Sequence, residues 1–340
     1  MNIDKSILNK IKITPLLDTL KLENISDEEY FSEKYNEFIS NSRLGILKRS
    51  GVKAFFEGIK SEYNPSFQFG SNLHALYLQP ESFELIESVF KPTAKAGLMA
   101  DALYKNDGTI PTDDEIKSMS YIIGYYKDKL TPNRLKEFKD KAEPYWRDRF
   151  VYEQNNPIQE KIRIYTDEKS IGLINCCLES INNNKEFNKL IHPEGITEDP
   201  YSNNEQTILL DIKAEIPEYE SKIFRLKAKL DNFTIDKEEN IITINDLKTT
   251  SKLANEFDPT FFSYQREIAS YSWLLKLCSE KFFDLNSPII NGNFLVVSTI
   301  PNFNSLVYPM TKKLFDIGWK EYIYLLKTVI YYSIVEGYEI

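Results

Sequence analysis

Two acidic residues and a lysine are spaced so that they could bind a metal ion next to a phosphodiester. Asp246 and Lys248 are two residues apart in the stretch 241–248, whose apolar and β-branched residues predict a strand. Side chains two apart in a strand point to the same face, so this carboxylate and this ammonium group are expected side by side. The carbonyl group of Leu247, between them, is a further hard oxygen ligand for a metal.

Asp231 is expected to lie beside this pair. Residues 223–231 alternate between polar and apolar, which predicts a half-buried strand with Lys227, Lys229 and Asp231 on one face. The polar run after this stretch predicts a hairpin turn. The turn would return the chain and place Asp231 on the strand next to Asp246.

Two carboxylates and a lysine provide the parts of a Mg²⁺ site with an open position for water. Phosphodiester hydrolysis needs a metal ion that neutralises charge on the phosphate and binds the attacking water, with a cation beside it. Lys227 and Lys229 could hold the phosphates of the substrate. A surface hairpin with solvated charges is the alternative, because an Asp-x-Lys pair by itself is a weak signal.

Four further polar residues could join this site. Glu267 and Tyr271 are four residues apart in the helix expected at 261–278, so they lie on one face of it. Gln265 lies half a turn away on the same helix and could contact DNA. Glu205 comes just before the first strand, where it could support the metal or be a solvated charge.

A sheet with covering helices is needed to position these residues. The order of the predicted elements indicates an α/β core that begins with a mostly antiparallel meander. The preceding residues read as helical. We therefore expect three segments, at 1–60, 61–200 and 201–340, with 61–340 forming one compact unit. The predicted strands lie at 207–212, 223–231, 241–248 and 294–299, and the helices that follow lie at 261–278 and 312–336.

Composition excludes several classes of protein. An apolar fraction of 42% and a charged fraction of 27% in 340 residues are globular values, so wholesale disorder is excluded. A net charge of −9 excludes a globally basic nucleic-acid binder but leaves room for a local basic groove. Three cysteines, Cys176, Cys177 and Cys278, are too few for a disulfide framework or a four-cysteine metal site. We find neither a signal peptide nor a membrane span, which predicts a cytoplasmic protein.

Three sequence segments resemble the PD-(D/E)xK nuclease superfamily: Lys-Ala-Lys-Leu-Asp231, Ile-Asn-Asp246-Leu-Lys248-Thr-Thr, and Arg266 to Tyr271. The stretch around Gly70 and His74 is similar to the histidine-bearing helix of the RecB/RecE branch. Residues 39–44, which read Ile-Ser-Asn-Ser-Arg-Leu, resemble the segment that opens many such domains. The nearest likeness is to phage and prophage exodeoxyribonucleases of the RecE (exonuclease eight) type.

This resemblance implies a restriction-endonuclease-like core, a mixed sheet flanked by helices, with a large helical N-terminal part. It implies that Asp231, Asp246 and His74 bind Mg²⁺ or Mn²⁺ and that Lys248 positions or activates the attacking water. The resemblance also implies catalytic roles for Glu267 and Tyr271 on the helix, where the family usually has Gln in place of Glu267. Iron–sulfur branches carry four cysteines, so no cluster is expected here.

The implied activity is exonucleolytic. Such an enzyme would degrade duplex DNA from its ends, 5′ to 3′, and leave a single strand for phage-type recombination with an annealing protein. Homo-oligomers are common in the family. Two alternatives stay open: a structure-specific or restriction-like endonuclease on the same fold, and a catalytically silent DNA-binding scaffold.

Two features upstream of the core have two interpretations each. A lone histidine on an apolar helix, such as His74, is either structural or a metal ligand. Ser42 and Arg43 either contact a DNA end or backbone, or belong to a helix N-terminus with Ser40 or Ser42 as the N-cap.

Overall fold

The computed structural model describes residues 5–58, 65–125, 130–157, 161–191 and 203–340. The chain forms two compact units: one combines residues 1–59 with 184–340, and the other consists of residues 60–183. This division differs from the three expected segments, because the N-terminal residues pack with the C-terminal part of the chain.

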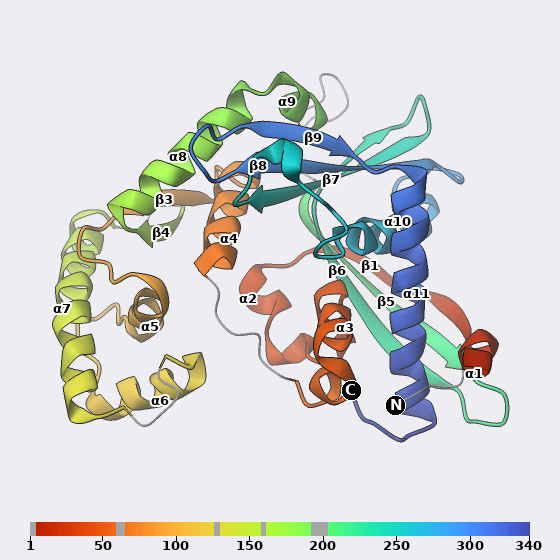
Figure 1. Ribbon diagram of the computed structural model, residues 1–340, viewed down its shortest axis with the longest axis horizontal. Helices are drawn as coiled ribbons and strands as arrows, with labels where there is room; N and C mark the ends of the chain where they lie inside the picture. Colours follow the sequence, from red (N-terminus) through yellow and green to blue (C-terminus); the bar gives the residue numbers. More distant parts are fainter. Residues whose placement is uncertain (1–4, 59–64, 126–129, 158–160, 192–202) are drawn as a thin grey trace. The chain divides into compact units, whose positions relative to one another are not determined.

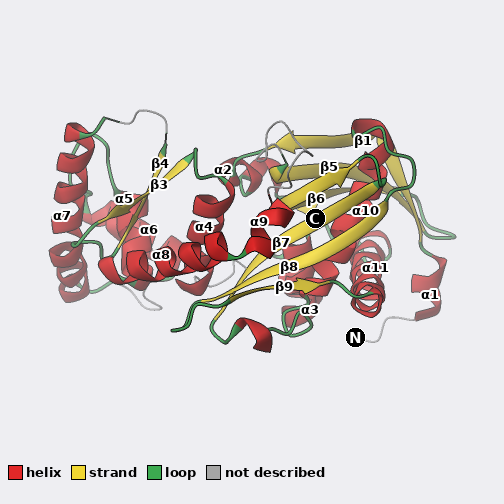
Figure 2. Ribbon diagram, turned by 90° about the horizontal axis from the view of Figure 1, so that it is seen from above, coloured by secondary structure: helices red, strands yellow, loops and turns green. Residues whose placement is uncertain are grey.

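The first unit is built on a mixed sheet, seven-stranded over the described residues, in the order β1-β5-β6-β7-β8-β9 with β2 beside β6 (Figure 2). The β7–β8 and β2–β6 pairs are parallel, and the other neighbours are antiparallel. The predicted α/β class, a mixed sheet flanked by helices, is confirmed. The strands are β1 (Lys12–Asn24), β2 (Phe38–Ile39), β5 (Asn204–Glu215), β6 (Lys222–Asp236), β7 (Ile241–Thr250), β8 (Ile289–Ser298) and β9 (Ser305–Pro309).

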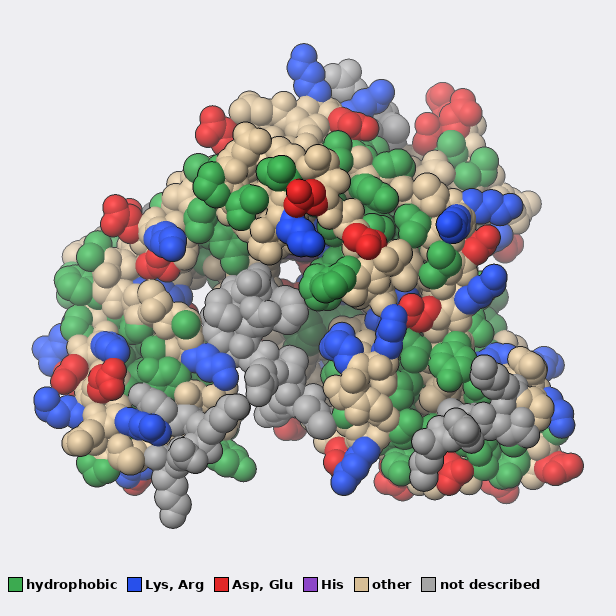
Figure 3. All heavy atoms as spheres, in the orientation of Figure 1, with side chains coloured by type: hydrophobic (Ala, Val, Ile, Leu, Met, Phe, Trp, Pro, Cys, Tyr) green, Lys and Arg blue, Asp and Glu red, His purple; other side chains and the backbone are tan. Residues whose placement is uncertain are grey.

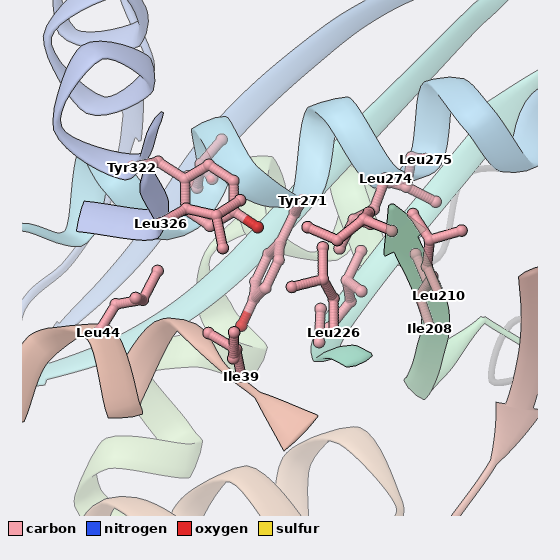
Figure 4. Packing of buried hydrophobic residues seen from close by; sticks show 14 of the residues in the cluster. Ile39, Leu44, Ile208, Leu210, Leu226, Tyr271, Leu274, Leu275, Tyr322 and Leu326 are labelled. Carbon is pink, nitrogen blue, oxygen red and sulfur yellow. The ribbon is translucent and has the colours of Figure 1, made fainter. Parts of the chain in front are cut away.

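Helices cover this sheet, and α10 provides the crossover that the parallel β7–β8 pair requires (Figure 1). In the core, Ile208, Leu210 and Leu226 of the sheet lie against Leu274 and Leu275 of α10 (Figure 4). The helical elements of this unit are α1 (Lys5–Lys10), α2 (Asp27–Tyr30), η1 (Glu33–Tyr35), α3 (Asn41–Phe56), α9 (Lys185–Ile191), η2 (Ala254–Glu256), α10 (Tyr264–Phe282) and α11 (Lys312–Ile334).

The second unit is mainly helical and has its own core, which includes Met99, Phe138, Tyr145 and Trp146. A parallel pair of short strands, β3 and β4, interrupts the helices, so the prediction of a purely helical segment is incomplete. The elements are α4 (Pro65–Leu78), β3 (Phe83–Glu87), α5 (Ala94–Leu103), α6 (Asp113–Ile123), α7 (Pro132–Asn155), β4 (Ile162–Thr166) and α8 (Glu168–Asn183).

The prediction that residues 1–60 are helical is wrong for β1. This strand lies at the edge of the sheet, where Pro15 is tolerated because one side of the strand needs no backbone donor. Its register shifts between Leu16 and Lys21. The shift removes the period-two pattern by which a strand is read from a sequence.

Charged side chains of both signs are interspersed over the face shown in Figure 3. Among the helices of the described residues, none is long and apolar enough to cross a membrane.

Candidate active site

The candidate site lies where β6 and β7 stop pairing with each other. Their antiparallel ladder runs from Asp236 paired with Ile241 to Asn232 paired with Asn245. The next position would pair Asp231 with Asp246, but there the strands separate. Beyond this point β7 continues beside β8, whereas β6 pairs with β5 and, near its start, with β2.

Asp231 sits at an irregularity of β6. Leu230 and Phe233 are both fully buried in the same core cluster, although residues three apart in a regular strand point to opposite faces. The regular alternation is therefore broken at Asp231 and Asn232. Asp231 Oδ2 accepts the backbone N–H of Leu247 over 2.7 Å, a side-chain contact where the ladder has ended. Irregularities of this kind often re-aim a side chain at a functional site.

Lys248 connects the strand to α10. Its Nζ lies 2.7 Å from Asp246 Oδ2 and 3.3 Å from Glu267 Oε2. Glu267 Oε1 in turn accepts the hydroxyl of Tyr271 over 3.0 Å. The predicted neighbours on one helix face thus lie together, and Glu267 contacts Lys248 directly.

Burial and mutual charge control the ionisation of this cluster. Asp246 is only 2% exposed, and burial raises its pKa well above the usual value; Lys248 opposes this shift, and Glu267 and Asp231 add to it. Burial alone would lower the pKa of Lys248. The carboxylates of Asp246, Glu267 and Asp231 instead raise that pKa well above its usual value. The lysine is therefore a charged hydrogen-bond donor here.

Tyr271 is buried and its ring is part of the core (Figure 4). Burial, together with the nearby Glu267 carboxylate, raises the pKa of its hydroxyl well above the usual value. Its hydroxyl is directed to Glu267 from within the core. The catalytic role implied for Tyr271 stays a prediction.

Glu205 joins the site from β5. The register pairs Asn204 with Asn232 and Gln206 with Leu230, so Glu205 lies opposite Asp231. A carboxylate oxygen of Glu205 is within 4.8 Å of one of Asp231. Its backbone has a φ of 54°, in the left-handed region, which breaks the regular strand geometry at this position. Of its two predicted interpretations, this arrangement favours support of a metal.

These residues fit a hard divalent cation. The carboxylates of Glu205, Asp231, Asp246 and Glu267 outnumber the nearby ammonium groups of Lys248 and Lys229, and all belong to the first unit. Carboxylate oxygens are the ligands that Mg²⁺ prefers, and a cation would offset their mutual repulsion.

An asparagine ladder, formed by Asn204, Asn232, Asn245 and Asn293, crosses four neighbouring strands next to the acidic residues. Each hydrogen bond runs from an amide Nδ2 to the Oδ1 of the asparagine on the neighbouring strand. Asn232 donates to Asn204 over 2.6 Å, Asn245 donates to Asn232 over 2.8 Å, and Asn293 donates to Asn245 over 3.2 Å. Asn245 also donates to the carbonyl of Leu190 over 3.1 Å.

The ladder was not predicted, although the sequence carries a signal for it. Asn204, Asn232 and Asn245 each stand next to one of the acidic residues, in the pairs Asn204–Glu205, Asp231–Asn232 and Asn245–Asp246. All three asparagines are buried. A buried polar network with its hydrogen bonds made fixes a local geometry, so the ladder holds these backbone positions in register.

Lys227, which could hold a substrate phosphate by the sequence pattern, is buried against aromatic rings, and the phosphate contact stays a prediction. It is 9% exposed, donates to the carbonyl of Tyr30 over 2.7 Å and lies 4.2 Å from the centre of the Tyr30 ring. The rings of Phe31 and Tyr35 complete an aromatic cage at 5.9 and 5.7 Å. Residues of α2 and η1, nearly 200 positions earlier in the chain, therefore enclose this lysine.

Lys229 is likewise occupied, by ion pairs with Asp27 and with Glu205, the latter at 3.1 Å. Its ammonium group contributes to the site by compensating an acidic residue. The suggestion that it holds a substrate phosphate stays a prediction.

Gln265 was a further candidate for contact with DNA, and the structure buries it. The side chain is 2% exposed, and its Oε1 has no hydrogen-bond partner within the described residues. The contact of Gln265 with DNA stays a prediction.

The Ser42–Arg43 segment forms a helix N-terminus. Ser40 is the N-cap of α3, and its hydroxyl accepts the backbone N–H of Arg43 over 3.2 Å. The Arg43 guanidinium donates to the carbonyls of Asn36 and Phe38 and lies over the Phe55 ring. Ser42 is exposed. The capping interpretation accounts for Arg43, and a DNA contact by Ser42 stays a prediction.

His74 lies on α4, in the second unit, and is partly buried. Its predicted role as a metal ligand, and that of the Leu247 carbonyl, stay predictions.

No protein-family model matches this chain, and no curated protein matches it. Among solved structures the chain is similar to a protein of Eubacterium rectale described as a "Putative exonuclease". The two share 10% identity with a TM-score of 0.44, over 91% of this chain and 86% of that chain.

Proposed function

We propose that this protein is a divalent-metal-dependent deoxyribonuclease. The observation that carries the proposal is the separation of β6 and β7 between Asp231 and Asp246, with the Lys248 ammonium group 2.7 Å from Asp246. Hydrolysis of a phosphodiester requires carboxylates for a metal and a cation beside it, and these residues provide both.

Asp231 and Asp246 would hold Mg²⁺ or Mn²⁺ through carboxylate oxygens, with the Leu247 carbonyl as a further oxygen ligand. Glu205 is near enough to Asp231 to support the same ion. His74 is included as a ligand on the strength of the sequence resemblance. When bound, such an ion neutralises charge on the phosphate and makes water a better nucleophile.

Each remaining residue has a distinct task. Lys248 donates hydrogen bonds to the attacking water or to a phosphate oxygen, which orients the water for in-line attack. Glu267 holds the Lys248 ammonium group, and Tyr271 holds Glu267.

The substrate that we propose is the end of duplex DNA, degraded 5′ to 3′ to expose a single strand. This direction, a role in phage-type recombination, an annealing partner and a homo-oligomer all come from the sequence resemblance. A restriction-like endonuclease would use the same metal ligands and is the second candidate.

Linear duplex labelled at one 5′ end and covalently closed circular DNA separate these activities. With Mg²⁺ or Mn²⁺ we expect loss of the linear DNA, early release of the labelled nucleotide and intact circles. Chelator should stop the reaction. Cutting of circles would establish the endonuclease instead, and absence of cleavage with either metal would favour a catalytically silent DNA-binding scaffold.

A further inference from the structure

Two neighbouring phenylalanines are displayed on the surface just before α10. Phe261 is 76% exposed and Phe262 is 63% exposed, and their rings meet edge to face with centroids 4.6 Å apart. Single exposed apolar residues are ordinary on protein surfaces. Two large adjacent rings that are exposed together, and contribute little to the core, are instead typical of a binding surface.

The turn that carries these rings is well ordered by hydrogen bonds. The Asp258 carboxylate accepts the backbone N–H and the hydroxyl of Thr260 over 2.8 and 2.7 Å. The N–H of Tyr264 donates to the carbonyl of Pro259 over 2.9 Å. The hydroxyl of Ser263 accepts from Lys48 Nζ over 2.7 Å, which ties the turn to α3. The rings are therefore held outward by a preorganised loop.

A chain of aromatic contacts leads from this pair to the candidate active site. The Phe262 and Tyr264 ring centroids are 5.6 Å apart, and the Tyr264 centroid is 5.0 Å from Lys248 Nζ. Tyr264 also stacks on Phe257 with an interplanar angle of 12°. The exposed pair is thus two aromatic contacts from the lysine that would face the reacting phosphate.

We propose that Phe261 and Phe262 form a stacking platform for an unpaired base near the phosphate that is cut. This inference rests on the proposed nuclease function and names how the substrate is held. A base next to the reacting phosphate lies within reach of a surface beside Lys248. Stacking on aromatic rings is tolerant of sequence, as a general nuclease requires.

Binding of oligonucleotides to the Asp246→Asn protein tests the platform without cleavage. One single-stranded oligonucleotide has normal bases at both ends, and a second has abasic sites at the terminal positions. The variants to compare in this background are the double variant Phe261→Ala/Phe262→Ala, its Phe→Leu counterpart, and Tyr121→Ala, which removes a similarly exposed ring in the second unit.

We expect the double alanine variant to lose about tenfold in affinity for the normal oligonucleotide and nothing for the abasic one. The leucine variant should behave like the alanine variant, because the ring and not its apolar area is used, and Tyr121→Ala should bind normally. Equal losses for both oligonucleotides, or none, would overturn the platform.

Sedimentation of the same proteins tests the alternative that a second copy of the chain, and not a base, binds to Phe261 and Phe262. A change of oligomeric state in the double alanine variant, with binding of the normal oligonucleotide unchanged, would overturn the proposal in favour of a protein interface. If the protein with Asp246 intact cleaves DNA while the platform variants bind normally, only this inference fails. If that protein cleaves no DNA, the proposed function fails first.

Discussion

The backbone N–H of Leu247 donates to Oδ2 of Asp231, at the position where β6 and β7 cease to pair. The Asp231 carboxylate thus accepts a backbone N–H of β7 at the point where the two strands diverge. Asp231 and Asp246, the two proposed carboxylate ligands, stand at the positions that follow the last ladder pair.

Two substitutions of Asp231 should separate its structural role from its chemical one. Asp231→Asn keeps an oxygen that can accept the Leu247 N–H but removes the charge, so we expect near-normal stability and loss of cleavage. Asp231→Ala also leaves the N–H unpaired in a partly buried place, which should cost about 1–3 kcal/mol of unfolding free energy. Urea denaturation of both variants measures the difference. Equal stabilities would show that the hydrogen bond is unimportant.

The asparagine ladder should affect metal binding although none of its side chains is a proposed ligand. Asn245 directly precedes Asp246 in the sequence. Asn245→Ala removes the hydrogen bonds that the side chain donates to Oδ1 of Asn232 and to the carbonyl of Leu190. We expect the Mn²⁺ concentration for half-maximal cleavage to rise about tenfold, as for other residues that support metal ligands.

Asn293→Ala is the matched control for the ladder, because Asn293 donates one bond at the end of the ladder and has no acidic neighbour in sequence. Its Mn²⁺ requirement should be nearly normal. Similar Mn²⁺ requirements in Asn245→Ala and Asn293→Ala would contradict a positioning role.

Gly318 lets α11 approach the start of α10, which carries Glu267. A Cβ atom at this position would lie 2.2 Å from the backbone carbonyl oxygen of Gln265. We expect Gly318→Ala to destabilise the first unit by about 1–3 kcal/mol and to reduce cleavage, because α10 must shift.

Gly172 of α8 provides the comparison, since a Cβ atom there meets nothing within 4 Å. Gly172→Ala should be neutral or stabilising by up to about 1 kcal/mol, since alanine favours the helix. Denaturation curves of the two variants check both expectations. A Gly318→Ala protein as stable as wild type would refute the close packing.

The caged Lys227 should make stability depend on pH. Burial, with the nearby Arg43 charge, lowers the pKa of Lys227 to about 8 from its ordinary 10.5. Between these values the unfolded chain binds more protons, so unfolding free energy should rise with pH, by about 1–3 kcal/mol in all.

Lys227→Met keeps the apolar stem and removes the titrating group. The stability of wild type relative to this variant should increase from pH 8 to pH 10.5 in denaturation experiments. A constant difference over that range would contradict the lowered pKa.

Part of this site could be predicted from the sequence because its signals are local. Alternation along β6 and the hairpin turn place Asp231 near Asp246, and two-residue spacing places Lys248 beside Asp246. The i, i+4 spacing likewise brings Tyr271 to Glu267.

The remaining features depend on distant parts of the chain. Lys227 reads as a solvated basic residue until Tyr30 and its neighbours fold over it. Gln265 reads as a surface residue until the packing of α10 buries it. The strand β1 cannot be predicted from its local pattern because it is an irregular edge strand that contains Pro15. In each case tertiary packing overrides the local pattern.

The central claim is that Asp246 supports metal-dependent cleavage of DNA. The most direct test is the initial rate at which linear duplex DNA releases nucleotides in Mg²⁺, measured for wild type and Asp246→Asn side by side. We predict a metal-dependent rate for wild type and a loss of at least about a hundredfold in the variant, since removing a group that stabilises the transition state costs roughly this factor. Equal rates for the two proteins would contradict the assignment of the site.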